Sequence, residues 1–137
     1  MRIYFDTFVF MDILSGSEYA DRAKEYIELL KKGTEGVISS VMFAELSYHL
    51  TKRKGKDKAE EVLIYIQSLP NMEIVPVSIE IAKKAGRLRV KYSRHDEKKL
   101  TYFDCIHLAT AIYSQCGKFI TGDRDFLGVD DIEIEVY

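Results

Sequence analysis

Four acidic residues, spread over most of the chain, have surroundings that suit metal-dependent chemistry. Asp6 and Asp123 each follow a short apolar run, whereas Glu45 and Asp104 are lone acids in longer apolar segments. A buried carboxylate costs several kcal/mol unless it is paired or bound to a metal. Four carboxylates within about 5 Å of one another would repel by roughly 3 kcal/mol per pair, and a divalent cation would remove that repulsion. We therefore predict Asp6, Glu45, Asp104 and Asp123 to be both metal ligands and catalytic residues.

Carboxylate oxygens of this kind indicate Mg²⁺ or Mn²⁺ as the cofactor, because both ions prefer oxygen ligands. Water bound to such an ion can attack a phosphodiester, and two ions about 4 Å apart could clamp the attacking and leaving oxygens. Thr7 and Thr121 stand close to the two acids that follow apolar runs, and their hydroxyls could orient a carboxylate or a metal-bound water. Asp125 is near enough to Asp123 to assist. One metal or two stays an open alternative.

The elements that must position these acids alternate along the chain. The pattern predicts strands at 3–5, 36–39, 73–77, 118–121 and 132–136, and helices at 8–14, 20–30, 41–50, 58–68, 79–92 and 102–113. Such alternation calls for a parallel sheet covered on both faces. We expect one α/β domain over residues 1–137, a three-layer sandwich with a central parallel sheet of four to five strands. Acids that follow its strands would meet at one end of the sheet, where open α/β sheets bind ligands.

Charge is distributed unevenly around this expected site. The formal net charge of the 137 residues is −2, which is not typical of a nucleic-acid-binding protein. Cations nevertheless crowd two regions, namely Lys52, Arg53, Lys54, Lys56 and Lys58, and Lys83, Lys84, Arg87, Arg89, Lys91, Arg94, Lys98 and Lys99. We expect residues 52–58 to form a basic connector between helices. An acidic pocket with a basic rim would suit a phosphate backbone, and solvated helix faces are the alternative.

Apolar runs in the sequence are too short to cross a membrane, which takes roughly 18 residues, and the first strand turns acidic at residue 6, unlike a signal peptide. We therefore expect a cytoplasmic protein with no membrane partner.

The ordered set of motifs resembles the PIN domain family, most closely the VapC-type toxins. Asp6-Thr7 follows a first strand, Glu45 lies in an apolar helix, and Phe103-Asp104 precedes Ala109-Thr110-Ala111. The segment from Thr121 to Phe126 completes the match. The resemblance implies a Mg²⁺- or Mn²⁺-dependent endoribonuclease that hydrolyses RNA, often as a homodimer. It also implies a small antitoxin protein as a partner that covers the active site.

Other residues near the motifs invite roles that we interpret as structural. His107 lies one turn after Asp104, and we expect a packed, hydrogen-bonded histidine rather than a metal ligand. His49 is expected to be structural and His95 to be a solvated loop residue. Tyr102 and Phe103 could stack on a base, but we expect Phe103 to pack in the core.

Three alternatives to a toxin nuclease stay open. A PIN nuclease of RNA maturation would use the same site. A phosphate-accepting receiver domain would have paired acids after strand one and a lysine at the end of a late strand, whereas here Lys118 begins its strand. A PIN-like binding module would lack catalysis altogether.

Overall fold

The computed structural model describes residues 1–93 and 100–137, and its centre is a sheet of five parallel strands. The strands are β1 (Arg2–Phe5), β2 (Glu35–Ser39), β3 (Met72–Val75), β4 (Lys118–Thr121) and β5 (Glu133–Val136). Their order across the sheet is β3-β2-β1-β4-β5, so the two strands with an expected edge position, β3 and β5, do lie at the edges. The predicted parallel sheet is confirmed, with β1 at its centre.

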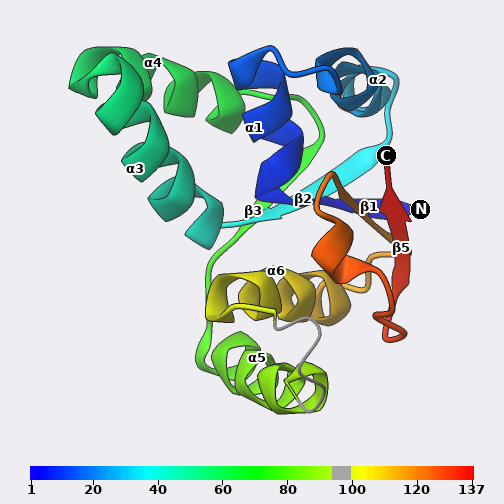
Figure 1. The fold of residues 1–137 in the computed structure, drawn as a ribbon. Helices are drawn as coiled ribbons and strands as arrows, with labels where there is room; N and C mark the ends of the chain where they lie inside the picture. The colour runs from blue at the N-terminus through cyan, green and yellow to red at the C-terminus, as the bar shows by residue number, and fades with distance from the viewer. Residues whose placement is uncertain (94–99) are drawn as a thin grey trace.

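Helices cover both faces of this sheet, which confirms the predicted three-layer sandwich (Figure 1). On one face lie α1 (Thr7–Ser15), α2 (Ala20–Lys31), α3 (Val41–Lys54) and α4 (Lys56–Gln67), and on the other lie α5 (Ile79–Tyr92) and α6 (Tyr102–Tyr113). A short 3-10 helix, η1 (Arg124–Phe126), follows β4. Within the described part of the chain, no helix is long and apolar enough to span a membrane.

Strand β1 is buried on both of its faces, as its unbroken apolar run predicts. Ile3 and Phe5 pack into the core beneath α1 to α4, whereas Tyr4 packs with α5 and α6 on the opposite face. Tyr4 lies beside Val37 of β2 and Phe119 of β4 in the parallel register. The strand therefore ties the two helical layers together and fixes where its last residue points the chain.

The end of β1 is the topological switch point of the sheet. From β1 the chain crosses to β2 on one side, and β4 later pairs on the other side. Ligands of open α/β sheets bind in the crevice outside the carboxyl ends of the strands at such a point. Asp6 follows β1 and Asp123 follows β4, so both acids lie at this crevice.

Residues 52–58 are not the connector that we expected. Helix α3 continues to Lys54, and α4 begins at Lys56, so only Gly55, with φ of 87°, separates the two helices. All of residues 51–58 are exposed, so no apolar periodicity marks this part of the helices in the sequence. The expected loop over 93–100 lies mostly outside the described residues, and so do His95, Arg94, Lys98 and Lys99.

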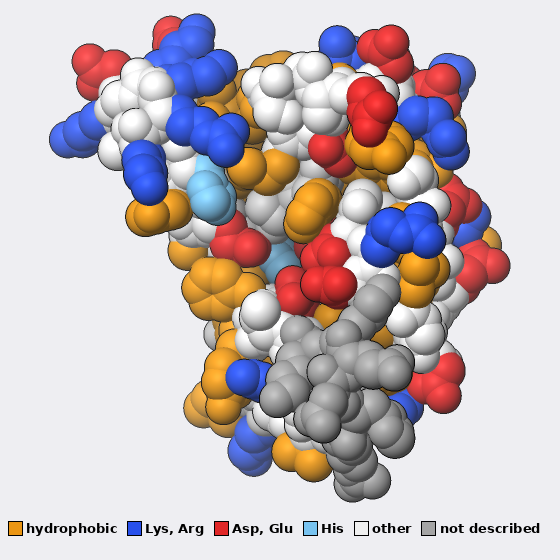
Figure 2. Space-filling model, in the orientation of Figure 1, with side chains coloured by type: hydrophobic (Ala, Val, Ile, Leu, Met, Phe, Trp, Pro, Cys, Tyr) orange, Lys and Arg blue, Asp and Glu red, His pale blue; other side chains and the backbone are white. Residues whose placement is uncertain are grey.

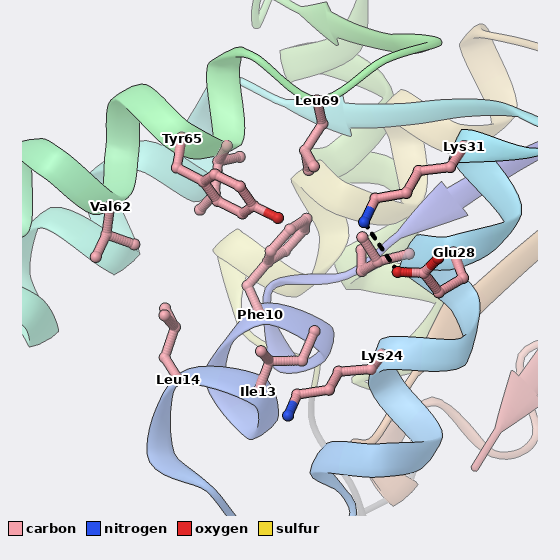
Figure 3. Close-up of a pocket in the computed structure, with 11 residues that line it drawn as sticks. Phe10, Ile13, Leu14, Lys24, Glu28, Lys31, Val62, Tyr65 and Leu69 are labelled. Carbon is pink, nitrogen blue, oxygen red and sulfur yellow. Dashed lines mark hydrogen bonds and ion pairs between the residues drawn. The ribbon is translucent and has the colours of Figure 1, made fainter.

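Helix α1 separates two cavities. One is an apolar cavity of about 230 Å³ between α1, α2 and α4 (Figure 3). Phe10, Ile13 and Leu14 of α1 line it together with Val62 and Leu69, and Lys31 forms an ion pair with Glu28 at its margin. The second cavity lies on another side of α1, at the switch point, and holds the acidic residues.

Candidate active site

Asp6 is the most buried acid of the site, with 3% of its surface exposed. It is the residue before α1, and its backbone N–H donates to the carbonyl of Ile120 at 3.0 Å. Thr121 donates a hydrogen bond from Oγ1 to Asp6 Oδ2 at 2.7 Å. Burial raises the pKa of Asp6 to about 6, despite the opposing effects of His107 and Thr121. A carboxylate held this way gains strongly from a nearby cation.

Glu45 is held by a network of side chains from three elements. Thr7 Oγ1 donates to Glu45 Oε1 at 2.8 Å, and His107 Nε2 lies 2.6 Å from the same oxygen. His107 Nε2 is also 3.0 Å from Thr7 Oγ1, and its Nδ1 is 2.5 Å from the hydroxyl of Tyr4. Tyr4 therefore orients the imidazole ring, and the ring and Thr7 together orient one oxygen of Glu45.

His107 is packed and hydrogen-bonded, as expected, with only 1% of its surface exposed. Burial lowers its pKa, but the hydrogen bond to Glu45 and the charges of Asp6 and Glu45 outweigh burial, so the pKa of His107 is raised overall. Its Nε2 also lies 4.0 Å from Asp6 Oδ1. The sequence did not reveal that this histidine links two of the predicted acids.

Asp104 lies in the first turn of α6, where it also completes a capping box. Thr101 Oγ1 accepts from the backbone N–H of Asp104 at 3.1 Å, and Asp104 Oδ2 accepts from the N–H of Thr101 at 3.0 Å. The predicted Thr101 cap is thus confirmed. The capping box fixes where the Asp104 side chain stands relative to the sheet.

A cavity of about 190 Å³ brings three of the four predicted acids together. It is lined by Asp6, Glu45 and Asp104, with Thr7, Phe8, Met11 and His49. Acidic side chains gather in the middle of the face seen in Figure 2, below the tip of α3 and α4. His49, which we expected to be structural, contributes to the wall of this cavity.

Asp123 stands next to this cavity rather than in its wall. Its side chain caps η1 by accepting from the N–H of Asp125 at 2.9 Å, and its own N–H donates to Thr121 Oγ1 at 2.9 Å. The same Thr121 hydroxyl binds Asp6. Thr121 therefore connects the two strand-end acids, while Asp125 is exposed on η1.

Phe103 is exposed and does not pack in the core, which corrects our expectation. It has 43% of its surface exposed, and Tyr102 is exposed too. Both belong to the first turn of α6, where successive residues point away from the helix in different directions. The inward positions fall on Cys105 and Leu108, which are completely buried.

The acidic residues suit a hard divalent cation by the chemistry of their donor atoms. In the described ranges, 1–93 and 100–137, no three His, Cys, Asp or Glu side chains are arranged to hold a metal ion as they stand. Mg²⁺ keeps several waters, however, and binds proteins through only one or two carboxylates. Buried Asp6, with its raised pKa and with Glu45 and Asp104 acting on it, is a fitting first ligand.

Comparisons with known proteins identify the family. No match was found among curated protein sequences. A family model described as PIN domain matches residues 3–132, which is nearly the whole chain. The chain belongs to the PIN domain family.

Solved structures with this PIN fold are similar over almost their full lengths. VapBC2 from Rickettsia felis, bound to a promoter DNA fragment, has a TM-score of 0.79 at 23% identity and covers 99% of this chain and 98% of its own. VapC20 from Mycobacterium tuberculosis, a toxin that cleaves the sarcin-ricin loop, has a TM-score of 0.71 at 20% identity, with 96% and 98% covered. A toxin–antitoxin complex from Klebsiella pneumoniae has a TM-score of 0.67 at 25% identity, with 95% and 94% covered.

Proposed function

We propose that this PIN domain is a Mg²⁺- or Mn²⁺-dependent endoribonuclease that hydrolyses phosphodiester bonds of RNA. The observation that carries the proposal is the meeting of Asp6, Glu45 and Asp104 in one cavity at the switch point of the sheet. These acids come from three segments far apart in the sequence, and Asp6 carries the raised pKa of a buried carboxylate. Groups with such perturbed pKa values in a cleft are candidates for a functional site.

The four acids would hold the metal, with Asp6, Glu45 and Asp104 in the cavity and Asp123 beside it. A bound divalent ion supplies an activated water and stabilises negative charge on the phosphate. The chain itself supplies orientation. Thr121 fixes Asp6, while Thr7 and His107 fix Glu45. Asp125 would assist through its backbone contact with the Asp123 side chain.

The proposal extends to the biological role, the toxin of a toxin–antitoxin pair. Similar structures include the VapBC2 assembly and the Klebsiella toxin–antitoxin complex, which supports a small antitoxin as a partner of this chain. The description of VapC20 as a cleaving toxin supports a catalytic role. The resemblance supports a homodimer, and the sequence supports action in the cytoplasm.

A cleavage assay with matched variants tests the enzymatic part. Purified protein is mixed with a pool of RNAs in Mg²⁺, Mn²⁺ or a chelator, and the cut sites are mapped. We expect cleavage that the chelator abolishes and that Asp6→Asn and Asp104→Asn lower by at least about 100-fold. Glu25→Gln, an exposed change on α2, is the control and should cleave normally.

Two outcomes would contradict this function. Intact RNA in every metal condition would favour a binding module without catalysis, as would a growth effect that Asp104→Asn leaves unchanged. Lys118 begins β4 and lies at the opposite end from Asp6, which argues against the receiver alternative. A nuclease of RNA maturation would cleave equally well, but its expression would not be offset by a neighbouring antitoxin gene.

A further inference from the structure

The tip formed by the end of α3 and the start of α4 is strongly basic. We call it the basic tip, and it consists of Lys52, Arg53, Lys54, Lys56 and Lys58, all of them exposed. Among the described residues, only Lys58 has a carboxylate within ion-pair distance, Glu61 at 3.3 Å. Figure 2 shows Lys and Arg side chains gathered at this tip, on the same face as the acidic side chains in the middle of the molecule.

Helix α3 connects the basic tip to the acidic cavity. Glu45 and His49 of this helix both line the cavity, and they lie four residues apart on one face of the helix. The ring of His49 contacts the ring of Tyr48, with centroids 5.1 Å apart, and Lys52 Nζ lies 5.7 Å from the centre of the Tyr48 ring. Tyr48 has 59% of its surface exposed. A continuous strip of side chains thus runs from the carboxylates to the cations.

Stabilisation of the helices explains only part of this charge. Lys52, Arg53 and Lys54 lie in the last turn of α3, where the helix dipole favours cations. Lys56 and Lys58 lie in the first turn of α4, where the dipole disfavours them. Five cations on one tip also repel one another, so folding alone gives no reason to concentrate them there.

We propose that single-stranded RNA extends from the acidic cavity along α3, with its phosphates bound by the basic tip. The proposal rests on the nuclease function and places the substrate of that site. Lys52, Arg53 and Lys56 would bind phosphates beyond the cleaved bond, and the exposed Tyr48 ring would stack on a base between them and the cavity. Glu45 and Arg53 are about 12 Å apart along the helix axis.

Charge and shape favour a nucleic-acid strand over other occupants of this strip. Two copies of the basic tip would repel each other, which argues against a self-interface here. A polyanion instead gains from both the cations and the aromatic ring, and cation release drives its binding. The cavity of about 190 Å³ is small for a drug-sized ligand, and it suits a single extruded strand better than a duplex.

The test compares two variants that each lose three cations. Lys52→Gln with Arg53→Gln and Lys56→Gln alters the basic tip, and Lys83→Gln with Lys84→Gln and Arg87→Gln alters α5 on the opposite face of the sheet. Binding of a labelled 12-nucleotide RNA is measured against salt concentration in the presence of Ca²⁺, and steady-state cleavage is measured with Mg²⁺. A dinucleotide is the second substrate, because its single phosphate leaves none for the tip once it occupies the cavity.

For the tip variant we expect KM for the 12-nucleotide RNA to rise at least about tenfold, with kcat within about twofold of the wild type. The slope of log affinity against log salt should become shallower by about 2, which is three contacts at about 0.7 each. Dinucleotide cleavage should not change. The α5 variant should behave like the wild type in all of these measurements.

Several results would overturn the proposal. An unchanged KM and salt slope in the tip variant would do so, as would an equal loss in the α5 variant, which would show a general charge effect. A change in oligomeric state with unchanged RNA binding would identify the tip as a contact between copies instead. RNA binding that depends on the tip, without cleavage in any metal, would keep this surface and reject the nuclease function.

Discussion

At the scale of single residues, Asp6 shows why the apo site is costly. Its folded-state pKa of about 6 lies above the ordinary value of 3.8, because burial disfavours the charged form. Between these two values the folded state holds the proton more tightly than the unfolded chain. The free energy of unfolding of the metal-free protein therefore decreases as pH rises through this window, by about 3 kcal/mol from this group.

Asp6→Asn tests this cost directly. The amide keeps an oxygen that can accept from Thr121 but carries no charge, so the variant should lack this pH-dependent loss between about pH 4 and pH 6. At pH 7.5 it should be more stable than the metal-free wild type by about 2 to 3 kcal/mol. Chemical unfolding with EDTA present measures both effects. Mg²⁺ should stabilise the wild type but not the variant, and equal pH profiles for the two proteins would contradict the argument.

The carboxylates of the site were predictable from the sequence, but their supporting side chains were not. Lone acids in apolar segments pointed to Asp6, Glu45 and Asp104. Tyr4 reads simply as part of an apolar strand, and its contact with His107 joins residues 103 positions apart. Such a pairing depends on strand order and register, which no local pattern in a single sequence encodes.

At the scale of elements, the start of α6 combines a structural role with a functional one. The Thr101 cap and the Asp104 carboxylate form one hydrogen-bonded unit, so the same residue that closes the helix also faces the acidic cavity. Helix α5 begins in a similar way, since Ser78 Oγ accepts from the N–H of Ile81 at 3.2 Å, but no acid of the site follows.

These two caps provide a matched pair of variants. Thr101→Ala and Ser78→Ala should each lower the free energy of unfolding by about 1 kcal/mol, because each removes a side-chain acceptor for an N–H of the first turn. Only Thr101→Ala should also lower metal-dependent cleavage, by about tenfold, because Asp104 loses part of its support. Urea unfolding and initial cleavage rates measure the two quantities. Equal losses of activity in both variants would show that the effect is one of stability alone.

Element boundaries were easiest to predict where burial or capping marks them. Ser78 and Thr101 precede apolar helices and were predicted correctly as caps. The end of α3 and the start of α4 were missed, because both lie in solvent and Gly55 alone breaks the helical path. Polar residues in an exposed helix and in a loop look alike in sequence.

At the scale of the whole molecule, the layers meet most closely at Gly36 in β2. A Cβ atom placed there would lie 2.6 Å from Leu30 Cδ2, 2.8 Å from Phe5 Cε2 and 3.0 Å from Met72 Sδ. These neighbours belong to α2, β1 and β3, so three elements converge on the missing side chain. Close packing of this kind leaves little room for adjustment.

Gly36→Ala should therefore destabilise the fold by about 1 to 3 kcal/mol through overpacking. Gly86→Ala is the control, because Gly86 lies within α5 and a Cβ there would meet no atom within 4 Å. This second change should stabilise the protein by about 0.5 to 1 kcal/mol through helix propensity. Thermal and urea unfolding compare the two, and a neutral Gly36→Ala would show that the layers can shift apart.

The architecture as a whole was predictable, because alternating strand and helix patterns leave few arrangements other than a covered parallel sheet. Pro76, just after β3, marked that strand as an edge strand. The position of β4 beside β1 was not predictable, since their pairing joins residues such as Tyr4 and Phe119 across most of the chain.

This insertion of a late strand beside the first one affects the order of events during synthesis. A ribosome that has released residues 1–113 has already delivered Asp6, Glu45 and Asp104, yet β1 still has an open edge and Asp6 lacks the hydroxyl of Thr121. The growing polypeptide thus reaches its final arrangement only after β4 emerges. Translation itself would delay the onset of any activity, because a partly made chain cannot complete the centre of its own sheet.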